Sequence, residues 1–175
     1  VKAGTEVTLY EQTDSLGGVV RHVIPEFRIP SASVEKDASF LEKLGVDIQL
    51  NVKIENAQAL RKQGYDAVIL AVGASKPGEL SLEKGGVINA LEFLKEFKEK
   101  DGDVMIGKNV AVIGGGNTAM DTARAAKRTK GVEHVYLVYR RTKRYMPADE
   151  EELLMAVEDG VEFRELLSPV LLEDG

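Results

Sequence analysis

Three consecutive glycines near the middle of the chain have a spacing that could bind phosphate. Gly114, Gly116 and Ala119 form the pattern G-x-G-x-x-A between an apolar segment, residues 109–113, and a helix-like segment, residues 117–130. Gly114 allows a tight strand-to-helix turn, Gly116 lets a pyrophosphate approach the backbone, and Ala119 allows close packing. The free amides at the start of the helix would hold the phosphates, although a turn that serves packing alone is the alternative. The residues predicted to bind pyrophosphate are Gly114, Gly115, Gly116, Asn117 and Thr118.

A basic group follows the next apolar segment, residues 134–139. The run "VYLVYRR" ends in Arg140 and Arg141, and Lys143 and Arg144 come just after it. Units that bind NAD have an acidic residue at this position, where it accepts hydrogen bonds from the ribose hydroxyls. Guanidinium groups instead bind a 2′-phosphate through paired, charge-assisted hydrogen bonds. The sequence therefore predicts NADP(H) rather than NAD(H), and a solvated basic loop is the alternative.

An acidic counterpart lies near the beginning of the chain. The run "VTLYEQ" has the same strand character but ends in Glu11, and Gly17 and Gly18 follow six residues later. A carboxylate at this position would bind a ribose diol without a 2′-phosphate, such as that of FAD. The strand and glycine turn that should precede Glu11 are expected N-terminal to Val1. A strand that ends in Glu is common, so this assignment depends on the other motifs.

The elements that must position these residues alternate between strand and helix, which is typical of parallel α/β sheets. The acidic run at residues 149–152 suits the first turn of a helix. Residues 75–86 contain Pro77 and three glycines, so we place a domain boundary there, between residues 1–76 and 77–175. The pattern predicts strands over residues 5–10, 46–54, 65–73, 109–113, 134–139 and 161–167, and helices over 33–44, 59–64, 89–102, 117–130 and 149–158. Asn89 is expected to cap the helix over residues 89–102.

Composition excludes several functions. The 175 residues carry a net charge of −6, which disfavours nucleic-acid binding because phosphate contacts need a basic face. No apolar run approaches the roughly 18 residues of a membrane-spanning helix, and no signal peptide is visible, so we expect a cytoplasmic protein. Cysteine is absent, which removes disulfides and iron–sulfur ligation by this segment. His22 and His134 lie far apart, and we expect no metal site.

Six segments, taken in order, resemble the pyridine-nucleotide and flavin region of the glutamate synthase small-subunit family. They are "E-x5-GG" from Glu11, "IPEFRIP", "DAVILAVGA", "GGGNTAMD", "VYRR" and "MPA". That family includes the flavin region of dihydropyrimidine dehydrogenase. The run "GGVVRHVIPEFRIP" looks closest to flavoprotein subunits described as selenate reductase iron–sulfur subunits. The resemblance covers nearly the whole chain, and the ordered set is far more specific than any one motif.

The resemblance implies a Rossmann-like NADP-binding domain inserted in an FAD-binding domain, the two-dinucleotide-binding flavoprotein type. Both domains would be incomplete: residues 1–76 lack the first strand and glycine turn, and residues 77–175 lack the C-terminal part. The implied activity is hydride transfer from NADPH to FAD, with electrons passing to an iron–sulfur domain or subunit and a catalytic reductase or synthase partner. Because the cofactors carry this chemistry, we predict no catalytic residue.

The resemblance also assigns cofactor-binding residues, with Val72 standing where the family has threonine. A regulatory module that binds NADP(H) without turnover is an alternative function, as is an α/β interaction domain without a ligand. The positions assigned to FAD are Glu11, Gly17, Gly18, Val19, Arg28, Ile54, Ala71, Val72 and Gly73. The positions assigned to NADPH are Gly114, Gly115, Gly116, Asn117, Thr118, Arg140, Arg141 and Arg144.

Overall fold

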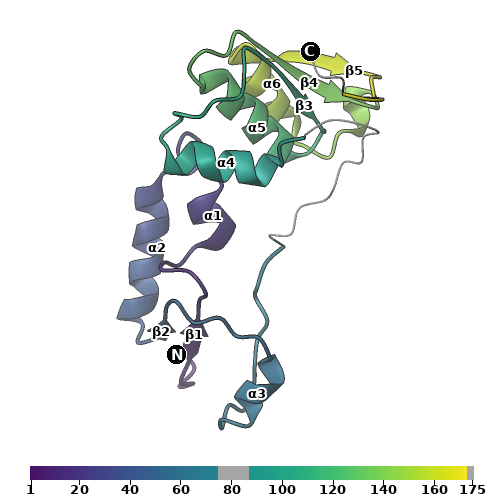
Figure 1. The fold of residues 1–175 in the computed structure, drawn as a ribbon. Coiled ribbons are helices and arrows are strands. Elements are labelled where there is room, and N and C mark those ends of the chain that lie inside the picture. Colours follow the sequence, from purple (N-terminus) through teal and green to yellow (C-terminus); the bar gives the residue numbers. More distant parts are fainter. Residues whose placement is uncertain (75–86, 173–175) are drawn as a thin grey trace. The chain divides into compact units, whose positions relative to one another are not determined.

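The computed structural model describes residues 1–74 and 87–172 (Figure 1). The chain divides into two compact units. One consists of Val1–His22 and Ile29–Ser75, and the other of Val23–Arg28 and Lys76–Gly175. The domain boundary predicted within residues 75–86 lies outside the described residues.

The first unit holds a small parallel sheet. Strand β1 (Thr8–Tyr10) pairs with β2 (Asp47–Gln49), so that Leu9 lies opposite Ile48. The predicted strand over residues 46–54 is too long, because Asn51 has a positive φ of 59° and the chain turns there. The helices of this unit are α1 (Gly18–His22), α2 (Ser31–Lys43) and α3 (Ala57–Arg61).

The prediction of a buried strand over residues 65–73 is wrong. This segment is extended but pairs with no strand in the part of the chain that the structure describes. Ile69, Leu70 and Val72 are consequently 89%, 70% and 85% exposed. A strand buries its side chains only when neighbouring elements cover its faces and pair its backbone groups, and an apolar pattern cannot supply those neighbours.

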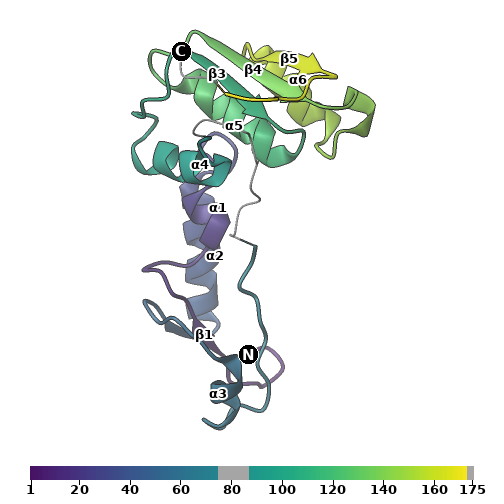
Figure 2. The ribbon, with the colours of Figure 1, turned by 45° about the vertical axis from the view of Figure 1, so that its right-hand side comes forward.

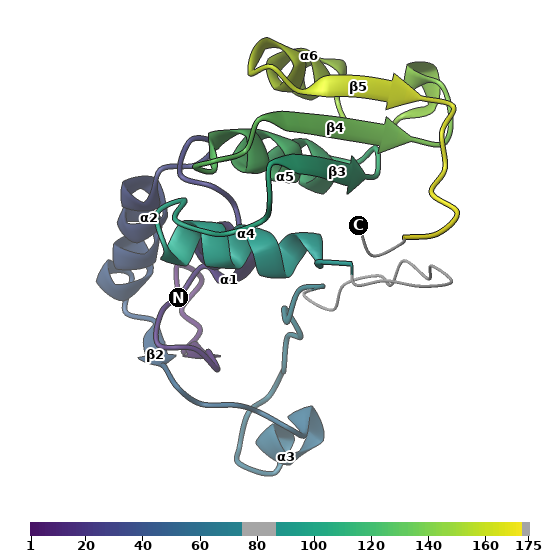
Figure 3. The same cartoon turned by 45° about the horizontal axis from the view of Figure 1, so that its top comes forward.

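The second unit contains three parallel strands in the order β3-β4-β5. They are β3 (Asn109–Ile113), β4 (His134–Tyr139) and β5 (Glu162–Glu165), and their arrows point the same way in Figure 3. The bounds of β3 and β4 agree with the prediction. Strand β5 ends earlier than predicted because Leu166 has a positive φ of 60°. The carboxyl ends of all three strands therefore meet at one edge of the sheet.

Helix α5 (Asn117–Arg128) packs against β3 and β4 and contacts both α4 (Ala90–Glu99) and α6 (Glu150–Glu158). Figure 2 shows α5 below the sheet. Alanines line the buried face of α5, so this helix can approach the strands closely. The Asn89 side chain accepts a hydrogen bond from the Leu91 amide at 2.9 Å and caps α4, as the sequence predicts. The most deeply buried large side chains of this core are Leu94, Met120, Val135 and Leu137.

The segment Val23–Arg28 belongs to this second unit, which the sequence does not indicate. Pro25 is fully buried, and the ammonium of Lys98 donates a hydrogen bond to the Ile24 carbonyl at 2.8 Å. The guanidinium of Arg128 lies 4.2 Å from the centre of the Phe27 ring, a distance typical of a cation–π contact. These contacts fix a loop that Pro25 alone would only leave extended.

Across residues 1–74 and 87–172, the structure contains no helix of the length and apolar character needed to cross a membrane.

Candidate nucleotide-binding site

The glycine turn joins β3 to α5 and has the geometry that its spacing predicts. Gly114 adopts a φ of 153°, and its amide donates to the Val138 carbonyl at 3.0 Å, which ties the turn to β4. A Cβ on Gly114 would lie 3.1 Å from the methyl group of Ala119. The turn therefore requires a glycine at the first position and a small residue five positions later, as dinucleotide-binding turns do.

Gly115 and Gly116 lack side chains for different reasons. A Cβ on Gly115 would lie 2.5 Å from the Tyr139 ring, so the protein itself fills that space. Among the described residues, a Cβ on Gly116 would contact only Pro147, at 3.9 Å, and Gly116 is the N-cap of α5, with no side-chain hydrogen bond. The described residues thus leave the space in front of the first turn of α5 open, and the amides of Asn117 and Thr118 begin the helix there. Sequence reasoning missed the ring beside Gly115.

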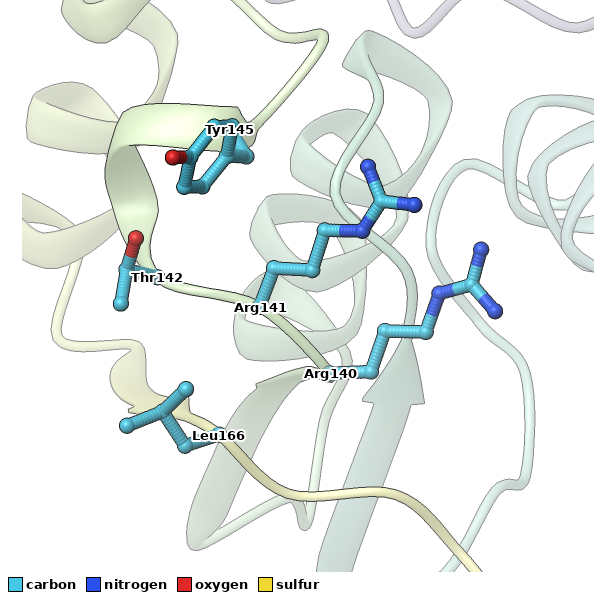
Figure 4. Close-up of a pocket in the computed structure, with 5 residues that line it drawn as sticks. All are labelled: Arg140, Arg141, Thr142, Tyr145 and Leu166. Atoms are coloured by element: carbon cyan, nitrogen blue, oxygen red, sulfur yellow. The ribbon is translucent and has the colours of Figure 1, made fainter.

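The predicted 2′-phosphate residues follow directly after β4. Arg140 and Arg141 are exposed and line an open pocket of about 380 Å³, whose other lining residues are Thr142, Tyr145 and Leu166. Figure 4 shows the guanidinium groups of Arg140 and Arg141 extending to the same side of the loop. Neither guanidinium has a hydrogen bond or an ion pair with another described residue. Two such groups side by side can donate paired hydrogen bonds to a phosphate.

The basic loop, which we define as residues 140–148, is fastened to the glycine turn. The Tyr139 hydroxyl donates to the Tyr145 carbonyl at 2.6 Å, within the short 3₁₀ helix η1 (Lys143–Tyr145) that also carries Arg144. Farther along, the Ala148 amide donates to the Gly115 carbonyl at 3.0 Å. The glycine turn and the basic loop therefore form one connected site at the carboxyl edge of the sheet.

In the first unit, Glu11 comes directly after β1, as predicted. Its carboxylate accepts hydrogen bonds from the amide of Thr13 at 2.8 Å and from the hydroxyl of the same residue at 3.0 Å. Gly17 has a φ of 118°, and a Cβ there would lie 2.9 Å from Val34, so only glycine fits. Gly18 begins α1, and Val19 on that helix is 37% exposed. These positions could accept a ligand, but their assignment to FAD stays a prediction.

The other positions assigned to FAD in the first unit lie in extended segments. Ile54 is 38% exposed, and Val72 lies between the exposed residues Ala71 and Gly73. Gly73 has a φ of 70°, so the chain changes direction at the end of this segment. The roles of these residues toward FAD stay predictions.

Arg28, which was assigned to FAD, pairs with carboxylates of the second unit. Its Nη1 lies 3.0 Å from Asp121 Oδ1 on α5, and it also donates a hydrogen bond to Glu152 on α6. Burial raises the pKa of Asp121 above its usual value, although the charge of Arg28 opposes this shift. The hydrogen bond with Glu152 raises the pKa of Arg28. The guanidinium thus has a structural role here, and its contact with FAD stays a prediction.

A parallel sheet has a glycine turn after one strand and, after the next, two arginines whose guanidinium groups pair with no other described residue, and this combination defines a Rossmann-type nucleotide-binding unit. The model of the family described as pyridine nucleotide-disulphide oxidoreductase matches residues 2–165, so the chain belongs to this family. The predicted two-dinucleotide-binding fold class is confirmed, and the family is one of pyridine-nucleotide oxidoreductases, as the sequence predicts.

Sequence similarity to named proteins supports the assignment to this family. The chain is 42% identical to YgfK of Escherichia coli (strain K12) over 96% of its own length and 16% of that protein. It is 35% identical to the NAD-dependent dihydropyrimidine dehydrogenase subunit PreT of the same strain, over 97% of the chain and 42% of PreT. It is 39% identical to the NADPH-Fe(3+) oxidoreductase subunit beta of Geobacter sulfurreducens, over 98% of the chain and 27% of that protein. The predicted resemblance is confirmed, and the chain spans less than half the length of each of these relatives.

Among solved structures, FprA of Mycobacterium tuberculosis in complex with NADPH has the same fold. The TM-score is 0.71 at 21% sequence identity, and the match covers 97% of this chain and 54% of FprA.

Proposed function

We propose that this chain is the NADPH-binding segment of a flavin-dependent oxidoreductase. In the whole protein, hydride would pass from NADPH to FAD, and electrons would continue to iron–sulfur clusters and a distant acceptor site. The observation that carries the proposal is the position of Arg140 and Arg141, whose guanidinium groups pair with no side chain in the described part of the chain, on a loop held beside the glycine turn. A site with both features can bind both the pyrophosphate and the 2′-phosphate of NADPH.

The residues fit this cofactor by their chemistry. The first turn of α5 presents backbone amides and the positive end of the helix dipole, which suit a pyrophosphate. Gly116 leaves room for that group, whereas Gly115 is closed off by Tyr139. Arg140 and Arg141, with Arg144 on η1, supply positive charge for a 2′-phosphate. When bound, NADPH supplies a hydride and FAD accepts it, while this chain's residues bind and orient the nucleotide.

The names of the relatives include both nucleotides, since PreT is called NAD-dependent and the Geobacter protein is named for NADPH. The arginines after β4 are our reason to prefer NADPH for this chain, because an NAD site typically has a carboxylate there. Both names also include the word subunit. This supports an iron–sulfur domain or subunit and a reductase or synthase as partners, and we include a cytoplasmic location in the proposal.

Calorimetric titration with NADPH and NADH tests this proposal directly. The wild-type chain should bind NADPH more tightly, and Arg140→Ala/Arg141→Ala should lose about tenfold or more in NADPH affinity, because each hydrogen bond to a charged group contributes about 1.5–3 kcal/mol. NADH binding should change little. Arg61→Ala/Lys62→Ala, which removes two exposed positive charges from the first unit, is the matched control and should bind NADPH like wild type. Equal affinity of wild type for both nucleotides would overturn the proposal.

A further inference from the structure

Tyr139, the last residue of β4, contacts the glycine turn through its ring. The residue is only 9% exposed, and its side chain projects from the same face of the strand as the buried Val135 and Leu137. A Cβ on Gly115 would lie 2.5 and 2.6 Å from two carbons of the Tyr139 ring. The ring therefore packs directly against the backbone of the turn that we propose holds the pyrophosphate.

The hydroxyl of the same side chain holds the basic loop. It donates to the Tyr145 carbonyl at 2.6 Å, and Tyr145 is also one of the residues that line the pocket beside Arg140 and Arg141. Beyond this bond, the loop returns to the turn through the Ala148 amide and the Gly115 carbonyl, at 3.0 Å. Tyr139 thus bonds to the middle of the loop while its ring contacts the turn.

This arrangement divides the proposed site into two parts with different dependence on Tyr139. The pyrophosphate part relies on the glycine turn and on α5. Helix α5 packs against β3 and β4, and its Ala119 lies close to Gly114 of the turn. The 2′-phosphate part relies on the loop, whose exposed arginines repel one another and lose side-chain freedom when they bind an anion. Holding the loop backbone in place lowers that ordering cost. Only a nucleotide with a 2′-phosphate would benefit from it.

We propose that Tyr139 is a positioning residue that sets the preference for a 2′-phosphorylated nucleotide by holding the basic loop against the glycine turn. The inference rests on the proposed function, because it assumes that the arginines of the loop receive the 2′-phosphate. Tyr139 itself would not touch the nucleotide.

The test is Tyr139→Phe, which retains the ring beside Gly115 and removes only the hydroxyl. The probes are NADP⁺ and NAD⁺, which differ only in the 2′-phosphate, titrated calorimetrically against the full chain. We expect the affinity for NADP⁺ to fall about 3- to 10-fold, the range for losing one hydrogen bond, and that for NAD⁺ to change less than about twofold. Tyr136→Phe is the matched control: Tyr136 lies on the other face of β4, where its ring stacks on His134, and both affinities should stay at wild-type values.

A second readout needs no ligand. Amide hydrogen exchange at Ala148 should become faster in Tyr139→Phe and stay unchanged in Tyr136→Phe, because the first variant frees the loop that the Ala148–Gly115 bond closes. Unchanged exchange in Tyr139→Phe would contradict the positioning role, whatever the nucleotide result.

The outcomes separate this inference from the proposed function. Suppose that wild type prefers NADP⁺ to NAD⁺, Arg140→Ala/Arg141→Ala loses that preference, and Tyr139→Phe keeps it. The proposed function then stands and the inference on Tyr139 is overturned. An equal loss for both probes in Tyr139→Phe would also overturn it, since that result indicates general damage to the site. If wild type shows no preference, the proposed function fails and the inference fails with it.

Discussion

Arg28 and Asp121 lie 93 positions apart in the chain, yet their side chains form an ion pair at 3.0 Å within the second unit. Glu152 on α6 completes the cluster by accepting a hydrogen bond from the same nitrogen of Arg28. The side chains of Asp121 and Glu152 are only 8% and 14% exposed. Arg28 therefore neutralises two nearly buried carboxylates and links the Val23–Arg28 segment to α5 and α6.

Arg28→Ala should destabilise the chain by about 2–3 kcal/mol. It leaves two carboxylates close together and without a counter-charge, and the loss stays below the roughly 3–5 kcal/mol of a fully buried pair because Arg28 is partly exposed. Urea unfolding measures the difference. Arg21→Ala is the control, since it breaks the more exposed pair with Glu35 and should cost less than about 1 kcal/mol. Equal losses for the two variants would contradict a structural role for the Arg28 cluster.

The Asp159 carboxylate, at the end of α6, should make the free energy of unfolding depend on pH in the acidic range. Arg124 donates to it at 2.7 Å, and Arg128 donates through two nitrogens at 2.6 and 2.9 Å. Burial by itself would raise the pKa of Asp159, but the hydrogen bonds and charges of Arg128 and Arg124 outweigh it and lower the pKa. A carboxyl whose pKa is lowered by folding stabilises the native state above its unfolded pKa of about 3.9. That contribution is lost as the pH falls through the folded value.

Asp159→Asn should therefore reduce the free energy of unfolding by about 1–2 kcal/mol at pH 7, where the charged hydrogen bonds of the wild type are intact. The difference between variant and wild type should narrow as the pH falls below about 3.9. Urea unfolding at a series of pH values measures both effects. Asp37→Asn, an exposed position on α2, should show neither. A difference that stays constant with pH would rule out the charge of Asp159 as the cause.

Much of the second unit could be predicted from its sequence because the signals are local. The alternating pattern of β4, the glycine turn and the Asn89 cap each depend on residues a few positions apart. The exposed segment around Ile69 was mistaken for a buried strand, because burial depends on neighbouring strands that the pattern does not specify. The sequence likewise does not predict that the Phe27 ring contacts Arg124 and Arg128, because these residues lie about a hundred positions from Phe27 in the chain.

The candidate site likewise has features that local sequence predicts and features that depend on contacts between distant residues. Arg140 and Arg141 could be identified from their position after an apolar strand, because the carboxyl end of a parallel strand lies at the ligand-binding edge of the sheet. The contact of Tyr139 with Gly115 could not, because it follows from the register in which Ile113 pairs with Val138. Sequence spacing therefore predicts which groups could meet a nucleotide, and pairing between strands determines how the protein supports those groups.

Gly115→Ala should destabilise the fold. The added methyl would lie 2.5 Å from the Tyr139 ring, whose hydroxyl is held by a hydrogen bond to the Tyr145 carbonyl. Overpacking of this kind costs about 1–3 kcal/mol. Thermal or urea unfolding measures the loss, and Gly115→Ala/Tyr139→Leu should recover part of it, because leucine lacks the ring carbons that the methyl meets. A double variant as unstable as the sum of its single changes would contradict a direct clash.

Gly116→Ala separates binding from stability at the neighbouring position. Within residues 1–74 and 87–172, the added methyl would meet only Pro147, at an ordinary contact distance of 3.9 Å, and the φ of −97° at this helix cap is open to alanine. We therefore expect the free energy of unfolding to fall by no more than about 1 kcal/mol, the usual effect of a poorer cap residue. The methyl would nevertheless occupy the space through which a pyrophosphate approaches the backbone. NADPH affinity should drop at least about tenfold in calorimetric titration, and NAD⁺ should lose as much as NADP⁺, because both carry the pyrophosphate. A variant that binds NAD⁺ and NADP⁺ like wild type would show that the nucleotide does not lie over Gly116.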